Sequence, residues 1–180
     1  GLAFALHEAH LEQRRGSGKN RRWVTVFRGP VIRIASPRAF LGTTLLERSG
    51  RHQRLGFFGE KTTLALAGAE LTRVDMVHPA FEDAFTIYAS DPVEARWLVD
   101  PLYAERLIAL EAAFAGQDIK ALFHRGALTV VLKAGNMFES GSLDPSEDRA
   151  LIARTVEQFM AMAGLAGVLV GRNGPPPPRP

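Results

Sequence analysis

The chain contains no cysteine, and its 180 residues include no apolar run long enough for a membrane-spanning helix. The lack of cysteine excludes disulfides, thiolate catalysis and cysteine-based zinc or iron–sulfur sites. A span would need roughly 18–20 consecutive apolar residues. The start of the chain also lacks the basic stretch of a signal peptide, and residues 2–6 resemble a strand instead. Because the first residue is Gly1, we expect an excised segment of a longer protein.

The overall composition is that of a folded protein, with 46% hydrophobic and 23% charged residues. A chain of this length suits one domain that buries about two thirds of its unfolded surface. We therefore predict a single domain over residues 1–170. The proline-rich tail, residues 171–180, is expected to be disordered.

Charge is distributed unevenly along the chain. Residues 1–60 hold 11 basic and 4 acidic side chains, whereas residues 61–120 hold 5 basic and 10 acidic ones. A basic region of this kind can bind an anionic partner. It can also be neutralised by the acidic region in the fold, or be simply solvated, and these two outcomes are the more common.

The first half of the chain has the period-two alternation of strands. Gly29–Pro30 falls within the second of these strands and predicts a bulge or an edge, because proline cannot donate to a strand ladder. We expect four strands, at residues 2–12, 23–34, 43–47 and 70–77, with a basic loop at 14–22 and a polar loop at 49–59.

The second half has helix signals. A helical turn at 79–84 would place Phe81 and Phe85 on one face, before a strand at 85–88. Three Asp-Pro pairs then combine an N-cap acceptor with proline at the first helical position. These pairs, which predict three helix starts, are Asp91-Pro92, Asp100-Pro101 and Asp144-Pro145.

Each of the three capped helices carries a packing prediction. In the first, Glu94 should close a capping box and Trp97 should pack inward, so that Trp97→Ala would cost about 3–5 kcal/mol. The second should end at Gly116 and bury Tyr103, Leu107, Leu110 and Phe114. The third should run to about Ala163, stop at Gly164 and bury Leu151, Ile152, Val156 and Phe159.

Between the last two helices, residues 119–123 and 127–133 predict a hairpin with Arg125–Gly126 in its turn. Strands therefore come largely first and helices later. We predict the α+β class, with a curved and mostly antiparallel sheet on which about three helices pack.

A metal site is weakly suggested at the start of the chain. Glu8, His10 and Glu12 would share one strand face and could offer one nitrogen and two oxygens to a metal. The pattern is not the zinc signature His-Glu-x-x-His. A solvated polar face explains it better, because half-buried strands alternate outward-facing polar residues. We expect no bound metal.

No motif for catalysis is present. The serines lie in turns or caps without a Gly-x-Ser-x-Gly elbow, and the glycines at 135–141 lack the spacing of a phosphate loop. A catalytic pair cannot be selected among the carboxylates of 70–118 from the sequence. We therefore expect no catalytic residues and no cofactor, and favour a protein that is not an enzyme.

The basic loop carries five cations with no acid among them and is followed by Trp23. Clustered arginines beside an aromatic side chain suit anionic lipid headgroups or nucleic-acid phosphates. No recognition helix accompanies them, so sequence-specific nucleic-acid binding is not expected. A solvated loop is the simplest interpretation. The candidate anion- or lipid-binding residues are Arg14, Arg15, Lys19, Arg21 and Arg22.

Three segments together carry a resemblance to a known family. They are Trp23–Gly29 with its Val-Phe-Arg-Gly run, Pro37–Phe40, and above all His78–Trp97, which continues into Pro101–Leu107. The chain resembles a bacterial family catalogued only as a domain of unknown function (three-one-three-seven), over roughly residues 1–163. The resemblance implies a hydrophobic hairpin upstream and hence a membrane-associated parent, and we expect the domain on the cytoplasmic side. It supplies no catalytic residues.

Three functional hypotheses remain open. The first is a non-catalytic interaction or regulatory module of a membrane-tethered bacterial protein, with a protein partner. The second is a hydrolase or metal-dependent enzyme whose site assembles only in three dimensions. The third is a binder of anionic lipid or nucleic acid that acts through residues 14–22.

Overall fold

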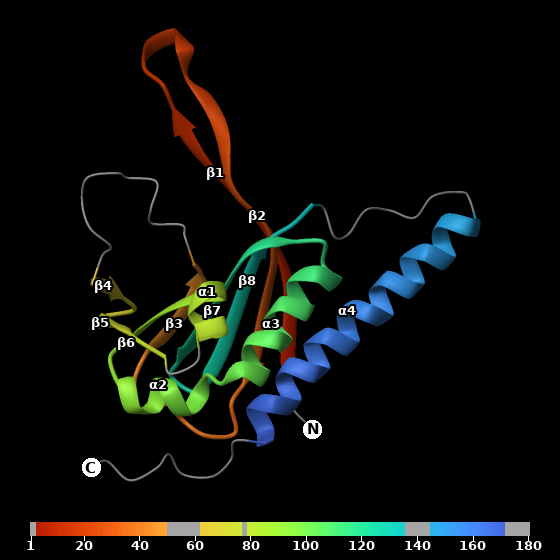
Figure 1. The fold of residues 1–180 in the computed structure, drawn as a ribbon. Coiled ribbons are helices and arrows are strands. Elements are labelled where there is room, and N and C mark those ends of the chain that lie inside the picture. The colour runs from red at the N-terminus through yellow and green to blue at the C-terminus, as the bar shows by residue number, and fades with distance from the viewer. Residues whose placement is uncertain (1–2, 50–61, 77–78, 136–144, 172–180) are drawn as a thin grey trace.

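The computed structural model describes residues 3–49, 62–76, 79–135 and 145–171. They form an eight-stranded antiparallel sheet that does not close, and four α-helices (Figure 1). The strand order is β1-β2-β8-β7-β3-β6-β5-β4. The strands are β1 (Phe4–Arg15), β2 (Arg22–Ala35), β3 (Thr44–Arg48), β4 (Thr63–Leu66), β5 (Ala69–Val74), β6 (Phe85–Ala89), β7 (Gln117–His124) and β8 (Ala127–Lys133). The helices are α1 (Pro79–Ala84), α2 (Pro92–Leu98), α3 (Pro101–Ala113) and α4 (Pro145–Gly171).

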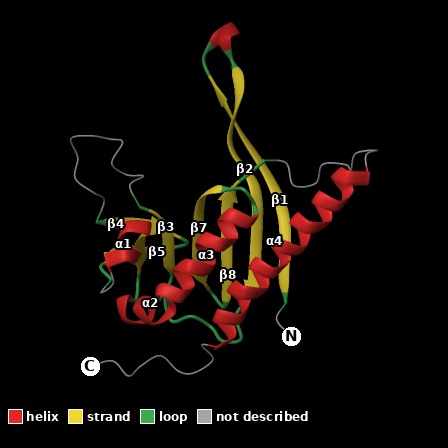
Figure 2. Cartoon of the chain, turned by 45° about the vertical axis from the view of Figure 1, so that its right-hand side comes forward, coloured by secondary structure: helices red, strands yellow, loops and turns green. Residues whose placement is uncertain are grey.

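This architecture confirms the predicted α+β class and the antiparallel sheet. The described residues contain four α-helices instead of about three, and the sheet is more prominent than the helices. Helix α3 packs against α4, and both lie over one face of the sheet (Figures 1 and 2). The main core lies in this layer, where Ile32, Leu46 and Leu107 are fully buried. Leu45 alternates to the opposite sheet face, where it packs in a smaller cluster with Leu71 and Tyr88.

Strands β1 and β2 are much longer than the rest of the sheet requires. They pair from Phe4↔Ile34 to Arg15↔Arg22, but β8 pairs only with residues 31–35 of β2. The outer part of the hairpin therefore has no neighbour among the described strands, and it projects from the body as a two-stranded arm (Figure 1). We call residues 11–27 the arm. A bulge between Leu11 and Glu12 marks its base.

The Gly29–Pro30 pair does not interrupt β2, which is a central strand and runs through both residues. The ladder from β2 to β8 ends at Val31, one residue after Pro30. Pro30 therefore lies just outside this ladder. Its lack of an N–H group costs no hydrogen bond to β8 there. Gly29 has a φ of 148°, and a Cβ there would collide with the carbonyl oxygen of Leu132. The arm leaves the sheet at this distortion.

Most elements of the second half agree with prediction. Phe81 of α1 and Phe85 of β6 are buried with ring centroids 5.7 Å apart. The hairpin of β7 and β8 turns at Arg125 and Gly126, both with positive φ. In α3 the predicted stripe is buried. Its end differs slightly, because Ala115, with a φ of 46°, makes the left-handed turn before Gly116.

Strand β4 was not predicted. It pairs with β5 through a tight turn in which Ala67 and Gly68 both have positive φ. A turn of this kind is normally signalled by Asn-Gly or Asp-Gly, and alanine gives no such signal. The predicted strand at 70–77 is observed as β5.

The predicted basic loop is shorter than expected. Arg14 and Arg15 belong to β1 and Arg22 belongs to β2, so only a short turn with one 3₁₀ segment, Gly18–Asn20, connects the strands.

The largest correction concerns α4. The helix does not stop at Gly164 but continues to Gly171. The buried side chains lie in its second half, at Met162, Leu165 and Leu169. The four side chains that were predicted to be buried are instead exposed: Leu151 (39%), Ile152 (63%), Val156 (56%) and Phe159 (48%). The periodicity identified an apolar face correctly, but α3 and the sheet cover a different stretch of the helix.

The start of α2 is also corrected in part. Asp91 is the N-cap, and its Oδ1 accepts from the backbone N–H of Val93 (3.1 Å) and Glu94 (3.0 Å). Glu94 does not close a capping box. Its carboxylate turns away and accepts from the N–H groups of Leu41 (3.0 Å) and Gly42 (2.8 Å). Tertiary contacts have therefore replaced the local one.

Three predictions lie outside the described residues, wholly or in part. They concern the polar loop at 49–59 beyond Ser49, the Asp144 cap and the tail beyond Gly171. In the ranges that are described, no helix is both long enough and apolar enough to cross a membrane.

Candidate functional site

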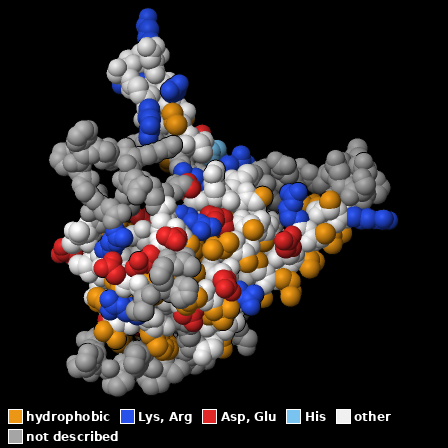
Figure 3. All heavy atoms as spheres, in the orientation of Figure 1, with side chains coloured by type: hydrophobic (Ala, Val, Ile, Leu, Met, Phe, Trp, Pro, Cys, Tyr) orange, Lys and Arg blue, Asp and Glu red, His pale blue; other side chains and the backbone are white. Residues whose placement is uncertain are grey.

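The arm places the five predicted cations at one extremity of the molecule. Arg14 and Arg15 end β1, Lys19 lies in the 3₁₀ turn, Arg21 directly follows that turn, and Arg22 begins β2. All five side chains are exposed. In the space-filling view, basic side chains mark the end and side of the arm, whereas most of the acidic side chains lie on the body (Figure 3).

The register of the arm brings like charges together. Arg15 lies directly opposite Arg22 in the last strand pair, where two cations repel each other and weaken the pairing. The Arg15 Nε donates to Gln13 Oε1 at 3.4 Å, a neutral acceptor. Within the described residues, no carboxylate forms an ion pair with any of the five cations. The charge is therefore not used to stabilise the arm.

Apolar side chains accompany this charge. Trp23 lies opposite Arg14, so both occupy one face of the arm, and 65% of Trp23 is exposed. Leu11 (55%) and Val26 (40%) are also exposed. A two-stranded ribbon has too little interior to bury them, so the arm presents cations together with an indole ring to its surroundings.

The acidic region does not neutralise the arm through the ion pairs that the structure describes. Its carboxylates instead join residues of the body: Glu94 pairs with Arg38 at 3.3 Å, and Glu111 pairs with Arg48. The two charged regions, residues 1–60 and 61–120, are thus joined in part by direct ion pairs, but within the described residues these pairs do not include the five cations of the arm.

The three weak metal candidates have other partners. Glu8 pairs with Arg28, whose Nε lies 3.4 Å from Glu8 Oε1. His10 Nε2 lies 3.0 Å from Thr25 Oγ1 and 3.8 Å from Glu12 Oε1. They share one face of β1, as predicted from the alternation. No group of three or more histidine, aspartate or glutamate side chains in the described ranges is arranged to hold a metal ion.

Two buried carboxylates form ion pairs that were not predicted from the sequence. Glu94, 1% exposed, ties residues 41–42 to α2 through two main-chain amides. Glu111 of α3 accepts from Arg48 Nε at 3.0 Å and from the N–H of Ile119 at 2.9 Å. Each carboxylate is saturated by an arginine and main-chain donors, as buried charges require. Glu94 lies far along the chain from Arg38, and Glu111 lies far from Arg48. No local sequence pattern could therefore have revealed these two ion pairs.

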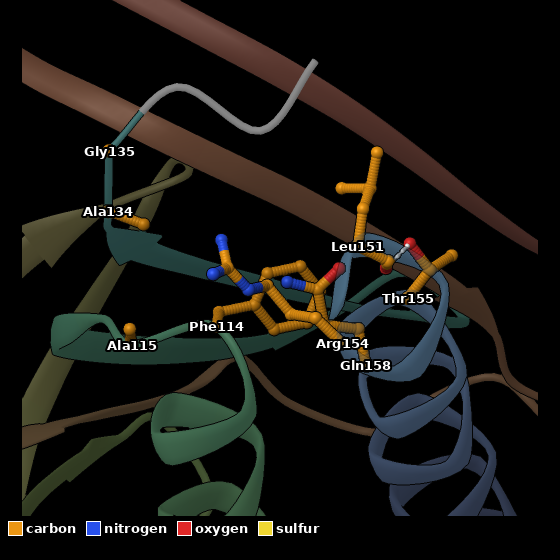
Figure 4. A pocket seen from close by; sticks show the side chains of 8 residues that line it. All are labelled: Phe114, Ala115, Ala134, Gly135, Leu151, Arg154, Thr155 and Gln158. Carbon is orange, nitrogen blue, oxygen red and sulfur yellow. Dashed lines mark hydrogen bonds between the residues drawn. The ribbon is translucent and has the colours of Figure 1, made fainter. Parts of the chain in front are cut away.

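One cavity lies where the end of α3, the end of β8 and the first half of α4 meet (Figure 4). Its volume is about 180 Å³, below the range of pockets that hold organic ligands. Arg154 and Gln158 are its main polar side chains, and the hydroxyl of Thr155 donates back to Leu151 O at 2.8 Å. Among the described residues that line it there is no carboxylate and no histidine.

The comparisons identify a family and nothing narrower. The family model described as "Protein of unknown function (DUF3137)" matches residues 25–170, and the chain belongs to this family. No curated protein and no solved structure matches the chain. The match begins within β2, so the first strand of the arm precedes it.

Proposed function

We propose that this chain is a non-catalytic interaction module of a membrane-tethered bacterial protein, and that its arm binds an anionic membrane surface. The observation that carries the proposal is the arm itself, which holds five exposed cations, two of them directly opposed, without a carboxylate partner among the described residues.

The arm contains features that lower its own folding stability. Opposed like charges and an exposed indole ring both disfavour the isolated arm, so the sequence of the arm is better explained by a partner than by folding. Each cation near an anionic bilayer contributes about 1 kcal/mol. Tryptophan favours the headgroup region, because its ring is apolar and its N–H is polar. An arm that combines Arg14 and Trp23 on one face suits such a surface.

Co-sedimentation with liposomes tests the proposal. The chain should bind phosphatidylserine-containing vesicles at low salt, and binding should vanish as the screening length falls to roughly 3 Å near 1 M salt. The double variant Arg15→Gln/Arg22→Gln should bind about tenfold to hundredfold more weakly. Arg149→Gln/Arg154→Gln on α4 is the matched control, since it removes the same charge and should bind nearly as well as the unchanged chain.

The other hypotheses predict different results. Equal loss in both double variants would indicate a general charge effect and contradict a role for the arm. Tight binding of a single-stranded oligonucleotide, with no binding to acidic vesicles, would favour the nucleic-acid alternative. Binding to neither would leave the arm as a solvated hairpin.

A further inference from the structure

One surface outside the arm combines an open strand edge with an uncovered apolar helix face. Strand β1 is the first strand of the sheet, so one of its two edges has no neighbour among the described strands. The N–H of Ala35 donates to the carbonyl of Ala3 at 3.0 Å, and the register is regular up to Leu11. In an antiparallel ladder the bonding direction alternates with each residue, so the main-chain groups of even-numbered residues point outward. These residues are Phe4, Leu6, Glu8 and His10.

The helix face is an apolar stripe in the first half of α4. Ile152, Val156, Phe159 and Met160 are spaced i, i+4, i+7 and i+8, and so lie on one side of the helix. They are 48–68% exposed. In Figure 3 apolar side chains follow the side of α4 that faces away from the body. No element in the described ranges covers this stripe, and an exposed apolar patch is characteristic of an interaction surface.

The open edge and the stripe form one continuous surface. The rings of Phe4 and Phe159 meet edge to face with their centroids 6.1 Å apart. Figures 1 and 2 both show the first half of α4 extending past β1, beyond the edge of the sheet. The helix thus overhangs the position that a further strand beside β1 would occupy.

We propose that this surface, the β1 edge with the α4 stripe, is the interface between two copies of the chain. An occupant must supply a strand to the open edge and an apolar face to the stripe. The same surface on a second copy supplies both when it is related by a two-fold axis, with β1 antiparallel to its counterpart and stripe against stripe. This assembly is independent of lipid binding by the arm.

Charge favours a second copy over other occupants. From Asp148 to Met160, α4 carries two acids and two arginines, so two copies of this half-helix have no net charge to repel each other. Antiparallel β1 strands would also direct the two basic arms to opposite ends of the dimer. A bilayer fits less well, because it offers no strand and because helices that lie on membranes are rich in lysine and arginine.

Sedimentation velocity on the full chain tests the proposal, from about 1 to about 100 μM, the range of a weak to moderate homodimer. We expect a dimer that Val156→Glu converts to monomer, with the dissociation constant raised at least about tenfold. Glutamate is a good helix former, so the exposed position should tolerate it. The matched control Ile108→Glu changes a 40% exposed side chain on α3 and should remain dimeric.

A second pair of variants tests the strand edge. The N–H of Glu8 points outward, so Glu8→Pro removes a donor to the second copy without removing one to β2. Glu8→Thr removes the same carboxylate and keeps the N–H. We expect Glu8→Pro to weaken the dimer and Glu8→Thr to preserve it.

Cross-linking provides a readout that does not depend on variant stability. Because the chain has no cysteine, Val156→Cys should give a disulfide-linked dimer under mild oxidation, whereas Ile108→Cys should not. A chain that stays monomeric at about 100 μM would refute the proposal. So would a dimer that is unaffected by Val156→Glu and does not cross-link through position 156.

Discussion

Helices α3 and α4 pack against each other, yet they use their apolar residues differently. In α3 every residue of the predicted stripe is at most 5% exposed, and Leu107 and Leu110 are fully buried. In α4 the residues predicted to be buried are 39–63% exposed, while Met162, Leu165 and Leu169 further along are buried. Both helices begin at an Asp-Pro pair in the sequence and both have helical periodicity.

The difference shows what periodicity can establish. A stripe at helical spacing indicates that one side of a helix is suited to a dry contact. It does not indicate which surface makes that contact, because the covering element is set by the tertiary arrangement. In α3 the cover is the sheet and α4. In the first half of α4 no described element covers the stripe, and we assign that role to a second copy.

The largest expected effect separates these two stripes directly. Leu107→Ala removes a fully buried side chain from the main core and should reduce the free energy of unfolding by about 3–5 kcal/mol, since a cavity remains. Val156→Ala should change it by no more than about 0.5 kcal/mol in the monomer. Urea denaturation at low protein concentration measures both.

The two variants would also reveal a wrong assignment of the α4 stripe. If Val156→Ala cost as much as Leu107→Ala, regardless of protein concentration, the stripe would be covered within the chain itself. The comparison between the helices would then fail, and with it the reason to expect a second copy.

Local signals account for what was predicted correctly. Asp91 and Asp100 cap their helices because a short side-chain acceptor reaches N–H groups two or three residues ahead. The turn at Arg125–Gly126 was located by its glycine. The alternation in β1 correctly placed Glu8, His10 and Glu12 on one face. All of these depend on neighbours within a few residues.

The failures have a common cause, which is that their partners are distant in the chain. Glu94 satisfied the capping-box pattern, but two main-chain amides more than 50 residues away provide its partners. The projecting arm is another example. The sequence identified a basic loop between two strands, but only the pairing of β2 with β8 shows that the strands outrun the sheet. The positive charge of the arm could be predicted from the sequence. The projection of the arm away from the rest of the sheet could not.

Trp97 of α2 is intermediate in burial between the buried stripe of α3 and the exposed stripe of α4. It is half-buried against the core, and the Arg38 guanidinium stacks over its ring with Cζ 4.3 Å from the ring centroid. Trp97→Ala should therefore reduce the free energy of unfolding by about 2–3 kcal/mol. This is less than the loss of about 3–5 kcal/mol expected from the sequence, which assumed a fully buried side chain. Trp97→Phe is the control that keeps an aromatic face, and it should lose about 1 kcal/mol. A value for Trp97→Ala near zero in chemical denaturation would class this residue with Val156 instead.

The smallest effect concerns the sheet face that α3 and α4 do not cover. Tyr88 is buried there beside Leu45 and Leu71. Burial raises the pKa of its phenol above the normal value, and the nearby Glu47 carboxylate raises it further, whereas Arg73 partly opposes both. The unfolded chain ionises Tyr88 near pH 10, while the folded chain holds the proton to higher pH. Stability from this group is therefore complete below about pH 10 and is lost as the pH rises through the folded-state pKa.

Two measurements check this effect. The chain has two tyrosines, so in the Tyr103→Phe variant the phenolate absorbance reports Tyr88 alone, and its midpoint should lie above about 10. Urea unfolding should show that the stability of the Tyr88→Phe variant falls less between about pH 9 and pH 11 than that of the unchanged chain, because phenylalanine has no phenol that ionises. A midpoint at or below the normal tyrosine value would mean that water reaches this face of the sheet. The sheet face that carries Tyr88 would then be less well buried than the face under α3 and α4, just as the stripe in the first half of α4 is less well buried than the stripe of α3.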